Sequence, residues 1–248
     1  MNKITSLLIS LVLVATLMVS CTFTETPLQS DIYQANVLIR YSSENAEMAA
    51  ALSALESKAT IYVSGDDFKI ETGSEMNNIS TRDTYVFFGG MLYHDGRITV
   101  DDKTVVTLER TNLSGDKLDQ LLTDVGAGAG ISSSDFNVKD MEGDELNYTH
   151  TCSRITGGAK SSLEALFGAK FKGYGTVELT GAEYTLIGKQ GRDESSTLTC
   201  HFNITMNGVT YDVTMQIITE YDYNAVFGIS APASASDYQQ VGYDEMFK

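Results

Sequence analysis

Residues 197–219 have the sequence TLTCHFNITMNGVTYDVTMQIIT, and this stretch decides the fold. Before Asn207-Gly208 the apolar residues occupy even positions, and after it they occupy odd positions. Because an Asn-Gly pair favours positive φ at both turn centres, it predicts a two-residue type I′ hairpin. The hairpin places apolar residues opposite one another on one face of a long ribbon: Met206 opposite Val209, Ile204 opposite Tyr211, Phe202 opposite Val213, Cys200 opposite Met215 and Leu198 opposite Ile217.

The composition is that of a folded, acidic protein. The chain has 248 residues, of which 42% are hydrophobic, and this is enough to build a core. It carries 33 acidic and 17 basic residues, for a formal net charge of −16. Because no cluster of Lys and Arg is present, we expect neither a nucleic-acid partner nor a basic patch for anionic lipids.

The N-terminus has the features of an export signal, which we expect to span residues 1–20. Lys3 supplies a short basic region, and an apolar run follows from Ile4 to Val19. The run is shorter than the roughly 20 apolar residues that a membrane-spanning helix needs. The sequence therefore predicts a cleaved signal and an exported protein.

Ser20-Cys21, at the end of this run, resembles the lipobox of bacterial lipoproteins, although Met18 stands where Leu, Val or Ile is usual. The resemblance implies that Cys21 is acylated, becomes the new N-terminus, and anchors the protein to the cell membrane or outer membrane. Several acyl chains hold a protein at a membrane better than one. Residues 21–32 would then be the lipidated cysteine and its tether. An ordinary cleaved signal with an incidental cysteine is the alternative.

The rest of the chain predicts strands and short helices without a composition break, so we expect a single domain over residues 33–241 and a C-terminal tail over 242–248. Apolar spacing and a capping Asn45 predict one helix, and spacing predicts two more. Gly89-Gly90 and Asp95-Gly96 predict the turns of a meander, with one strand carrying a Gly bulge as the alternative. The expected helices cover 46–58, 114–125 and 161–171, and the expected strands cover 35–41, 60–63, 68–70, 85–108, 136–138, 145–152, 174–180, 183–188, the ribbon and 225–229.

These elements predict an α+β fold. About ten strands with one apolar face fit a strongly curved, mostly antiparallel sheet, an open half-barrel, with about three short helices on its concave side. The concave face either packs fully against the helices or leaves a cavity between them.

Three features of the chain share their order with a known family. They are the lipobox-like start, the succession of Tyr85–Phe88, a Gly turn, Met91–Tyr93 and an Asp-Gly turn, and the Asn-Gly hairpin followed by Glu220–Tyr223 and Ala231-Pro232. Over roughly residues 33–241 this order resembles the LolA/LppX-type half-barrel of exported carrier proteins and lipoproteins. The resemblance implies non-covalent binding of a lipid, an acyl chain or another hydrophobic partner, and it brings no catalytic residues.

The candidate ligand-binding residues are the inward positions of the ribbon, and a dry core against Leu118, Leu121 and Leu163 is the alternative reading of them. A structural or protein-interaction lipoprotein of the cell envelope is therefore the second hypothesis, and an extracytoplasmic hydrolase is the third. The seven candidates are Leu198, Phe202, Ile204, Tyr211, Val213, Met215 and Ile217.

The remaining chemistry-bearing residues predict no reaction. Once Cys21 has its own role, Cys152 and Cys200 are suited to one disulfide, or to two buried thiols. His94, His150 and His201 stand singly, without the spacing of metal ligands. We expect no catalytic residues, no metal and no cofactor, and the sequence does not predict an oligomeric state.

Overall fold

The computed structural model describes residues 32–53, 55–76, 79–113, 115–125, 127–131, 133–171 and 175–247. The expected signal peptide and Cys21 lie outside this part of the chain. Twelve strands of the described part form one sheet, antiparallel except at one pair and not closed into a barrel. They are β1 (Ile32–Ser42), β2 (Ser57–Ser64), β3 (Asp67–Met76), β4 (Ile79–Phe88), β5 (Met91–Val100), β6 (Lys103–Asn112), β7 (Phe136–Gly143), β8 (Asn147–Ile155), β9 (Thr176–Lys189), β10 (Arg192–Met206), β11 (Val209–Asp222) and β12 (Gln239–Gln240).

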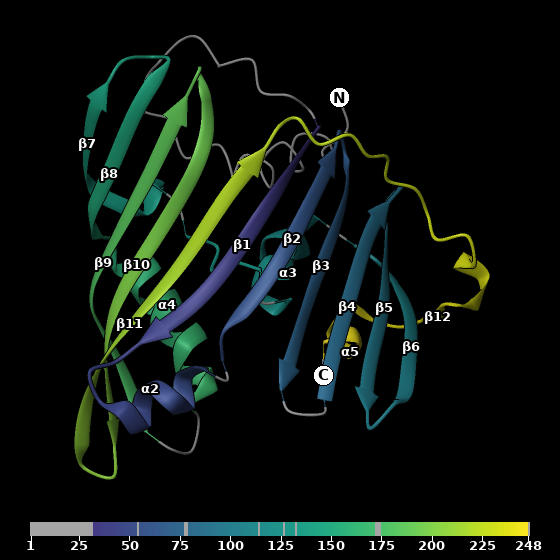
Figure 1. Ribbon diagram of the computed structural model, residues 1–248, viewed down its shortest axis with the longest axis horizontal. Helices are drawn as coiled ribbons and strands as arrows, with labels where there is room; N and C mark the ends of the chain where they lie inside the picture. The colour runs from purple at the N-terminus through teal and green to yellow at the C-terminus, as the bar shows by residue number, and fades with distance from the viewer. Residues whose placement is uncertain are drawn as a thin grey trace.

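The first strand lies in the middle of the sheet, whose order is β12-β6-β5-β4-β3-β2-β1-β11-β10-β9-β8-β7. On one side of β1 the strands β2 to β6 follow one another as a meander. On the other side β11 leads outward to β7, so the C-terminal half runs in reverse order (Figure 1). β12 lies parallel to β6 at one edge, and β7 forms the other edge.

The register predicted for the ribbon is confirmed. Met206 pairs with Val209, Phe202 with Val213, and the remaining apolar pairs follow as expected. Both turn residues have positive φ, 51° at Asn207 and 77° at Gly208, as a type I′ turn requires.

Helices cover the face of the sheet that bears the ribbon's apolar residues, which we call the inner face. In Figure 1, α3, α4 and α5 lie behind the sheet, while α2 lies at its lower end, where β10 turns into β11. The ring of Phe167 on α4 packs between Phe202, at a centroid distance of 4.5 Å, and Tyr41, at 5.4 Å. The four helices of the described part are α2 (Ala46–Ser53), α3 (Gly115–Asp124), α4 (Gly157–Lys170) and α5 (Tyr243–Met246).

Asn45 caps the first of these helices, as predicted. Its side-chain oxygen accepts a 2.9 Å hydrogen bond from the backbone N–H of Met48. The helix ends at Ser53 and not near residue 58, because β2 begins at Ser57.

The turn predicted at Asp95-Gly96 is wrong, whereas the turn at Gly89-Gly90 is confirmed. β5 continues through Gly96 to Val100, and the chain reverses at Asp101-Asp102 instead. A Cβ on Gly96 would lie 2.9 Å from Nε2 of His94. This glycine therefore gives space to a neighbouring imidazole and does not bend the chain.

Two further strand predictions are corrected. The segments 174–180 and 183–188 belong to one strand, β9, in which a bulge at Thr180 shifts the register with β10. Residues 225–229 form no strand, because β1 and β10 already flank β11 and leave no place beside it. The chain instead crosses the opposite, outer face of the sheet, where Phe227 contacts Tyr62 edge-on at 5.2 Å.

The predicted disulfide between Cys152 and Cys200 is also wrong. The two thiols are buried and are not joined to each other. β9 lies between their strands: Tyr184 pairs with Cys152 on one side, and Ala182 pairs with Cys200 on the other. Two strand spacings amount to about 9.5 Å, which is more than the Cα separation of about 6.8 Å that a disulfide tolerates.

Candidate functional site

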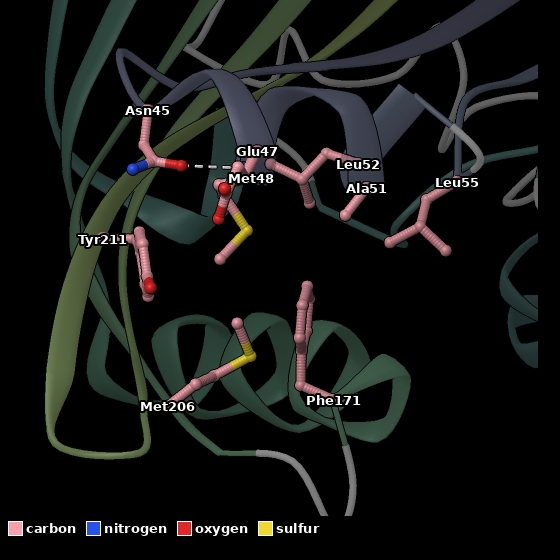
Figure 2. Close-up of a pocket in the computed structure, with 9 residues that line it drawn as sticks. All are labelled: Asn45, Glu47, Met48, Ala51, Leu52, Leu55, Phe171, Met206 and Tyr211. Atoms are coloured by element: carbon pink, nitrogen blue, oxygen red, sulfur yellow. Dashed lines mark hydrogen bonds between the residues drawn. The ribbon is translucent and has the colours of Figure 1, made fainter.

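A pocket of about 320 Å³ lies at the lower end of the sheet and is partly open to solvent. α2 forms one wall, and Phe171, directly after α4, lies opposite it (Figure 2). The tip of the β10–β11 hairpin closes one side. The residues that line the pocket are Asn45, Glu47, Met48, Ala51, Leu52, Leu55, Phe171, Met206 and Tyr211.

Most of this lining is apolar. In Figure 2 the thioethers of Met48 and Met206 point into the space between the helices, where the ring of Phe171 also lies. Methionine side chains adapt to ligands of irregular shape because they are unbranched and polarisable. The amide oxygen of Asn45 is engaged in capping α2. The pocket is therefore suited to a hydrophobic ligand and does not bring together the groups of an acid–base or nucleophilic mechanism.

The structure brings only one of the seven predicted ligand-binding residues into this pocket. Tyr211 is half-buried and lines it, as Figure 2 shows. The other six lie on the inner face as expected, but they are buried in the core. Phe202 and Ile204, for example, are 1% and 0% exposed. The six are Leu198, Phe202, Ile204, Val213, Met215 and Ile217.

The other apolar lining residues were not predicted as ligand contacts. Met48, Leu52 and Leu55 follow helical spacing, and Met206 follows the ribbon's alternation, so the sequence places them on apolar faces. Spacing alone does not show where a helix end stands away from a sheet. Leu118 was expected to pack on the ribbon, and its side chain lies outside the described part of the structure.

A second arrangement, at the upper end of the sheet, surrounds a buried carboxyl group. Asp193 is 3% exposed, and its Oδ1 accepts a 2.6 Å hydrogen bond from the hydroxyl of Tyr148. Burial raises the pKa of Asp193 to about 6, and the hydrogen bond from Tyr148 opposes this shift. The hydroxyl of Tyr223 and Oδ2 of Asp193 are both buried and have no hydrogen-bond partner among the described residues.

A third arrangement lies on the inner face of β4, β5 and β6. His94 is 8% exposed and stacks on Tyr85, with the ring centroids 4.5 Å apart. Its Nε2 lies 2.9 Å from Oδ1 of Asp83, and its Nδ1 lies 3.5 Å from Oε2 of Glu109. The described residues contain no group of three or more His, Cys, Asp or Glu side chains that could hold a metal ion. The side chains of Asp83 and Glu109 are partly exposed, so the three residues form a polar cluster around a buried imidazole.

A second pocket, of about 390 Å³, lies on the outer face between β4, β5 and the segment Ser230–Ala233. Arg97 in its wall makes two hydrogen bonds to Asp95, of 2.9 and 2.8 Å, so its guanidinium is already engaged. The lining is more polar than that of the pocket at the lower end.

Comparison with known proteins does not assign a family. No family model and no curated protein matches the chain. One structural comparison is with the crystal structure of an inactive mutant of the CurJ dehydratase in complex with a compound. The identity is 8% over 88% of this chain and 82% of that chain, and the TM-score of 0.13 carries no information on function. Among the described helices, none is long and apolar enough to span a membrane.

Proposed function

We propose that this protein is an exported lipoprotein, anchored through Cys21, that binds an acyl chain or a similar hydrophobic ligand without catalysing a reaction. In this proposal the sheet is a strongly curved open half-barrel of the LolA/LppX type, and its helices lie on the concave side. The observation that carries the proposal is the apolar pocket of about 320 Å³ between the sheet and the helices. Its volume lies at the lower end of the range of about 300–1,000 Å³ that is typical of ligand sites.

The chemistry of the pocket supports an acyl chain over a polar ligand. The apolar contacts come from α2, from the residue that follows α4 and from the β10–β11 hairpin; they are Met48, Leu52, Phe171 and Met206. Transfer of a chain from water into such a pocket is favourable by roughly 0.8 kcal/mol for each methylene buried. The acidic exterior, with a net charge of −16, keeps a protein with a hydrophobic cargo soluble.

Native mass spectrometry tests ligand binding. The protein, extracted gently from membranes, is expected to carry a non-covalent mass that dissociates on activation and is identified as a lipid. A mass spectrum of the bare protein alone, together with no uptake of added palmitate, would contradict the proposal.

Anchoring has a separate test, because it depends on the N-terminus and not on the pocket. Cys21→Ser is expected to move the protein from the membrane fraction to the soluble exported fraction. Cys152→Ser, at a buried position of β8, is the control and leaves the fractionation unchanged. An unchanged membrane-bound fraction for Cys21→Ser would exclude lipidation at this residue.

A second candidate function follows from the filled interior above the pocket. The ring of Phe167 contacts both Tyr41 and Phe202, so side chains fill this part of the inner face. This packing favours a structural or protein-interaction lipoprotein if native mass spectrometry and palmitate uptake are both negative.

A further inference from the structure

Between β11 and β12 the chain crosses the outer face of the sheet, and we call residues 225–238 the strap. In Figure 1 the strap runs from the end of β11, at the top of the sheet, to β12 at the right. Near its end Tyr238 packs edge-on against Tyr93 of β5 at 5.4 Å. The pocket of about 390 Å³ lies between β4, β5 and Ser230–Ala233 of the strap. The two strands therefore form its floor, and the strap forms a wall.

The chemistry of this floor changes along the strands. Three cross-strand pairs of β4 and β5 line the pocket, and they share one face because alternate residues of a strand point the same way. The pairs are Arg82 with Arg97, Thr84 with Asp95, and Val86 with Tyr93. The first and the third pair lie four residues apart, roughly 14 Å along the strands. The floor thus offers cations at one end, polar groups in the middle and apolar surface at the other end.

The arginine pair indicates an anionic ligand. Like charges at directly opposite positions of a sheet destabilise it. Arg97 donates hydrogen bonds of 2.9 and 2.8 Å to Asp95. Arg82 lies 3.5 Å from Glu71, whose carboxylate also pairs with Lys69 at 3.0 Å. Three cations share two carboxylates here, although the chain as a whole has a net charge of −16. A ligand that carries a carboxylate relieves the repulsion between the two guanidinium groups.

Both arginines keep N–H groups for such a ligand. A guanidinium group has five N–H donors in a planar fork, and Asp95 accepts hydrogen bonds from two of those of Arg97. These bonds hold the fork in place, so less side-chain freedom is lost when a ligand binds. The side chains of Arg82 and Arg97 are 67% and 55% exposed, so a solute can reach them. Planar forks of this kind bind carboxylates through two parallel hydrogen bonds.

The rest of the floor indicates the body that carries the carboxylate. Thr84 and Asp95 offer oxygen atoms that can bond the hydroxyl groups of a sugar. Tyr93 and Pro232 offer apolar surface to the C–H face of a sugar ring. An inorganic anion would contact neither region. A fatty acid would cover polar oxygen atoms without bonding them, at a cost in free energy.

We propose that the outer-face pocket binds an acidic saccharide, whose uronic-acid carboxylate lies between Arg82 and Arg97. Its hydroxyl groups bond Thr84 and Asp95, and the next sugar ring packs on Tyr93. This site is separate from the apolar pocket, which is formed by α2, Phe171 and the β10–β11 hairpin. The inference therefore goes beyond the proposed function and does not depend on it.

Isothermal titration of the full chain carrying Cys21→Ser tests the charge of the ligand. Digalacturonate, a disaccharide of uronic acid, is expected to bind. Its neutral counterpart α-1,4-galactobiose, which has a hydroxymethyl group in place of each carboxylate, is expected to bind more weakly by about tenfold or more. Arg82→Gln is expected to weaken digalacturonate binding to a similar extent. Arg40→Gln removes the same charge from an exposed position of β1 that does not line the pocket, so this control keeps the parent affinity.

A second pair of variants tests the place of binding. Ala231→Phe adds a ring to the wall that the strap forms, and it is expected to abolish digalacturonate binding because the ring fills the pocket. Val226→Phe adds the same ring to a residue of the strap that is 99% exposed and does not line the pocket, and it is expected to bind as the parent does. Urea unfolding of both variants shows that each still folds.

The outcomes decide the assignment. Loss of digalacturonate binding in Arg82→Gln and Ala231→Phe, with binding kept in their two controls, supports the site. No digalacturonate binding to the parent chain, or equal binding of galactobiose, overturns it. Binding that Arg82→Gln and Ala231→Phe leave unchanged overturns it as well, because the sugar then lies elsewhere. Palmitate uptake by the parent chain, measured separately, tests the proposed function and is expected to be the same in Arg82→Gln.

Discussion

The hydroxyl of Tyr148 donates a 2.6 Å hydrogen bond to the carboxyl group of Asp193 across the backbone of Gly188. Gly188 pairs with Tyr148 on one side and with Asp193 on the other, so three adjacent strands meet at this point. A Cβ built on Gly188 would overlap the ring of Tyr148. The absence of a side chain at residue 188 therefore allows the ring to reach the carboxyl group.

Gly188→Ala is expected to destabilise the protein by about 1–3 kcal/mol, the usual cost of overpacking a filled site. The methyl group forces the Tyr148 ring away from Asp193 and breaks their hydrogen bond. Urea unfolding followed by circular dichroism measures the change. Gly181→Ala is the control on the same strand, because its added Cβ would lie 3.8 Å from the nearest neighbouring atom, in ordinary contact. Equal stability of the two variants would contradict the explanation.

Asp193→Asn is expected to change the dependence of stability on pH. The folded protein raises the pKa of Asp193 to about 6, so it binds the proton more tightly than the unfolded chain does. The stabilising contribution of this proton is complete below about pH 4 and is lost as the pH rises through 6. The shift of about two units corresponds to roughly 3 kcal/mol.

In the asparagine variant, residue 193 binds no proton. The variant is therefore expected to have a higher free energy of unfolding than the parent at pH 7.5, and to lose most of this difference at pH 4.5. Urea unfolding at the two pH values gives the difference directly. Asp212→Asn, at an exposed position of β11, is the control. Its free energy of unfolding is expected to change between the two pH values as that of the parent does. If the free energy of unfolding changed with pH equally in Asp193→Asn and in the parent, the Asp193 carboxyl group would not titrate as described.

The two core cysteines are expected to behave as unreactive thiols in the native protein. Burial raises the pKa of the Cys200 thiol to about 12, so almost no thiolate is present at pH 8. Ellman's reagent is expected to detect neither Cys152 nor Cys200 before unfolding, and to detect both in denaturant without a reducing agent. Failure to detect them in denaturant would show that they are oxidised and that the strand arrangement around β9 is wrong.

Ala51→Phe is expected to fill the pocket at the lower end and to weaken palmitate binding by tenfold or more. Ala51 lines the pocket from α2 and is exposed, so the added ring enters empty space and stability changes little. Ala50→Phe places the same ring at the preceding exposed position, which does not line the pocket, and is the control. Equal weakening by both variants would indicate a general effect on α2 and not occupation of the pocket.

The sequence predicted the ribbon best, because two independent signals agreed there. The alternation of apolar residues and the Asn207-Gly208 turn each define the same register, and the structure confirms it at every pair. The mostly antiparallel, open sheet with helices follows from the same alternation in the other strands. The turn predicted at Asp95-Gly96 was wrong. An Asp-Gly pair occurs both in turns and at positions where a glycine leaves room for a neighbouring side chain, and the local sequence does not distinguish the two.

A local sequence pattern could predict neither the pocket nor the burial of the end of the chain in the core. Met48 and Leu52 have the spacing of a core helix, and the same spacing serves a packed face and a pocket wall. Tyr243 and Phe247 stand too close to the end of the chain to define a helix by periodicity, and their partners on β4 and α3 are more than a hundred residues away. Both features depend on how distant elements meet, so only coordinates reveal them.

The position of β1 in the middle of the sheet has a consequence for how the chain folds. The meander β2 to β6 and the succession β7 to β11 form through short connections, whereas the join between β1 and β11 brings together residues such as Arg40 and Gln216, 176 positions apart. Loop closure on this scale is slow. We therefore expect β1 and β11 to pair late, which leaves one edge of each half of the sheet unpaired until the C-terminal half is available.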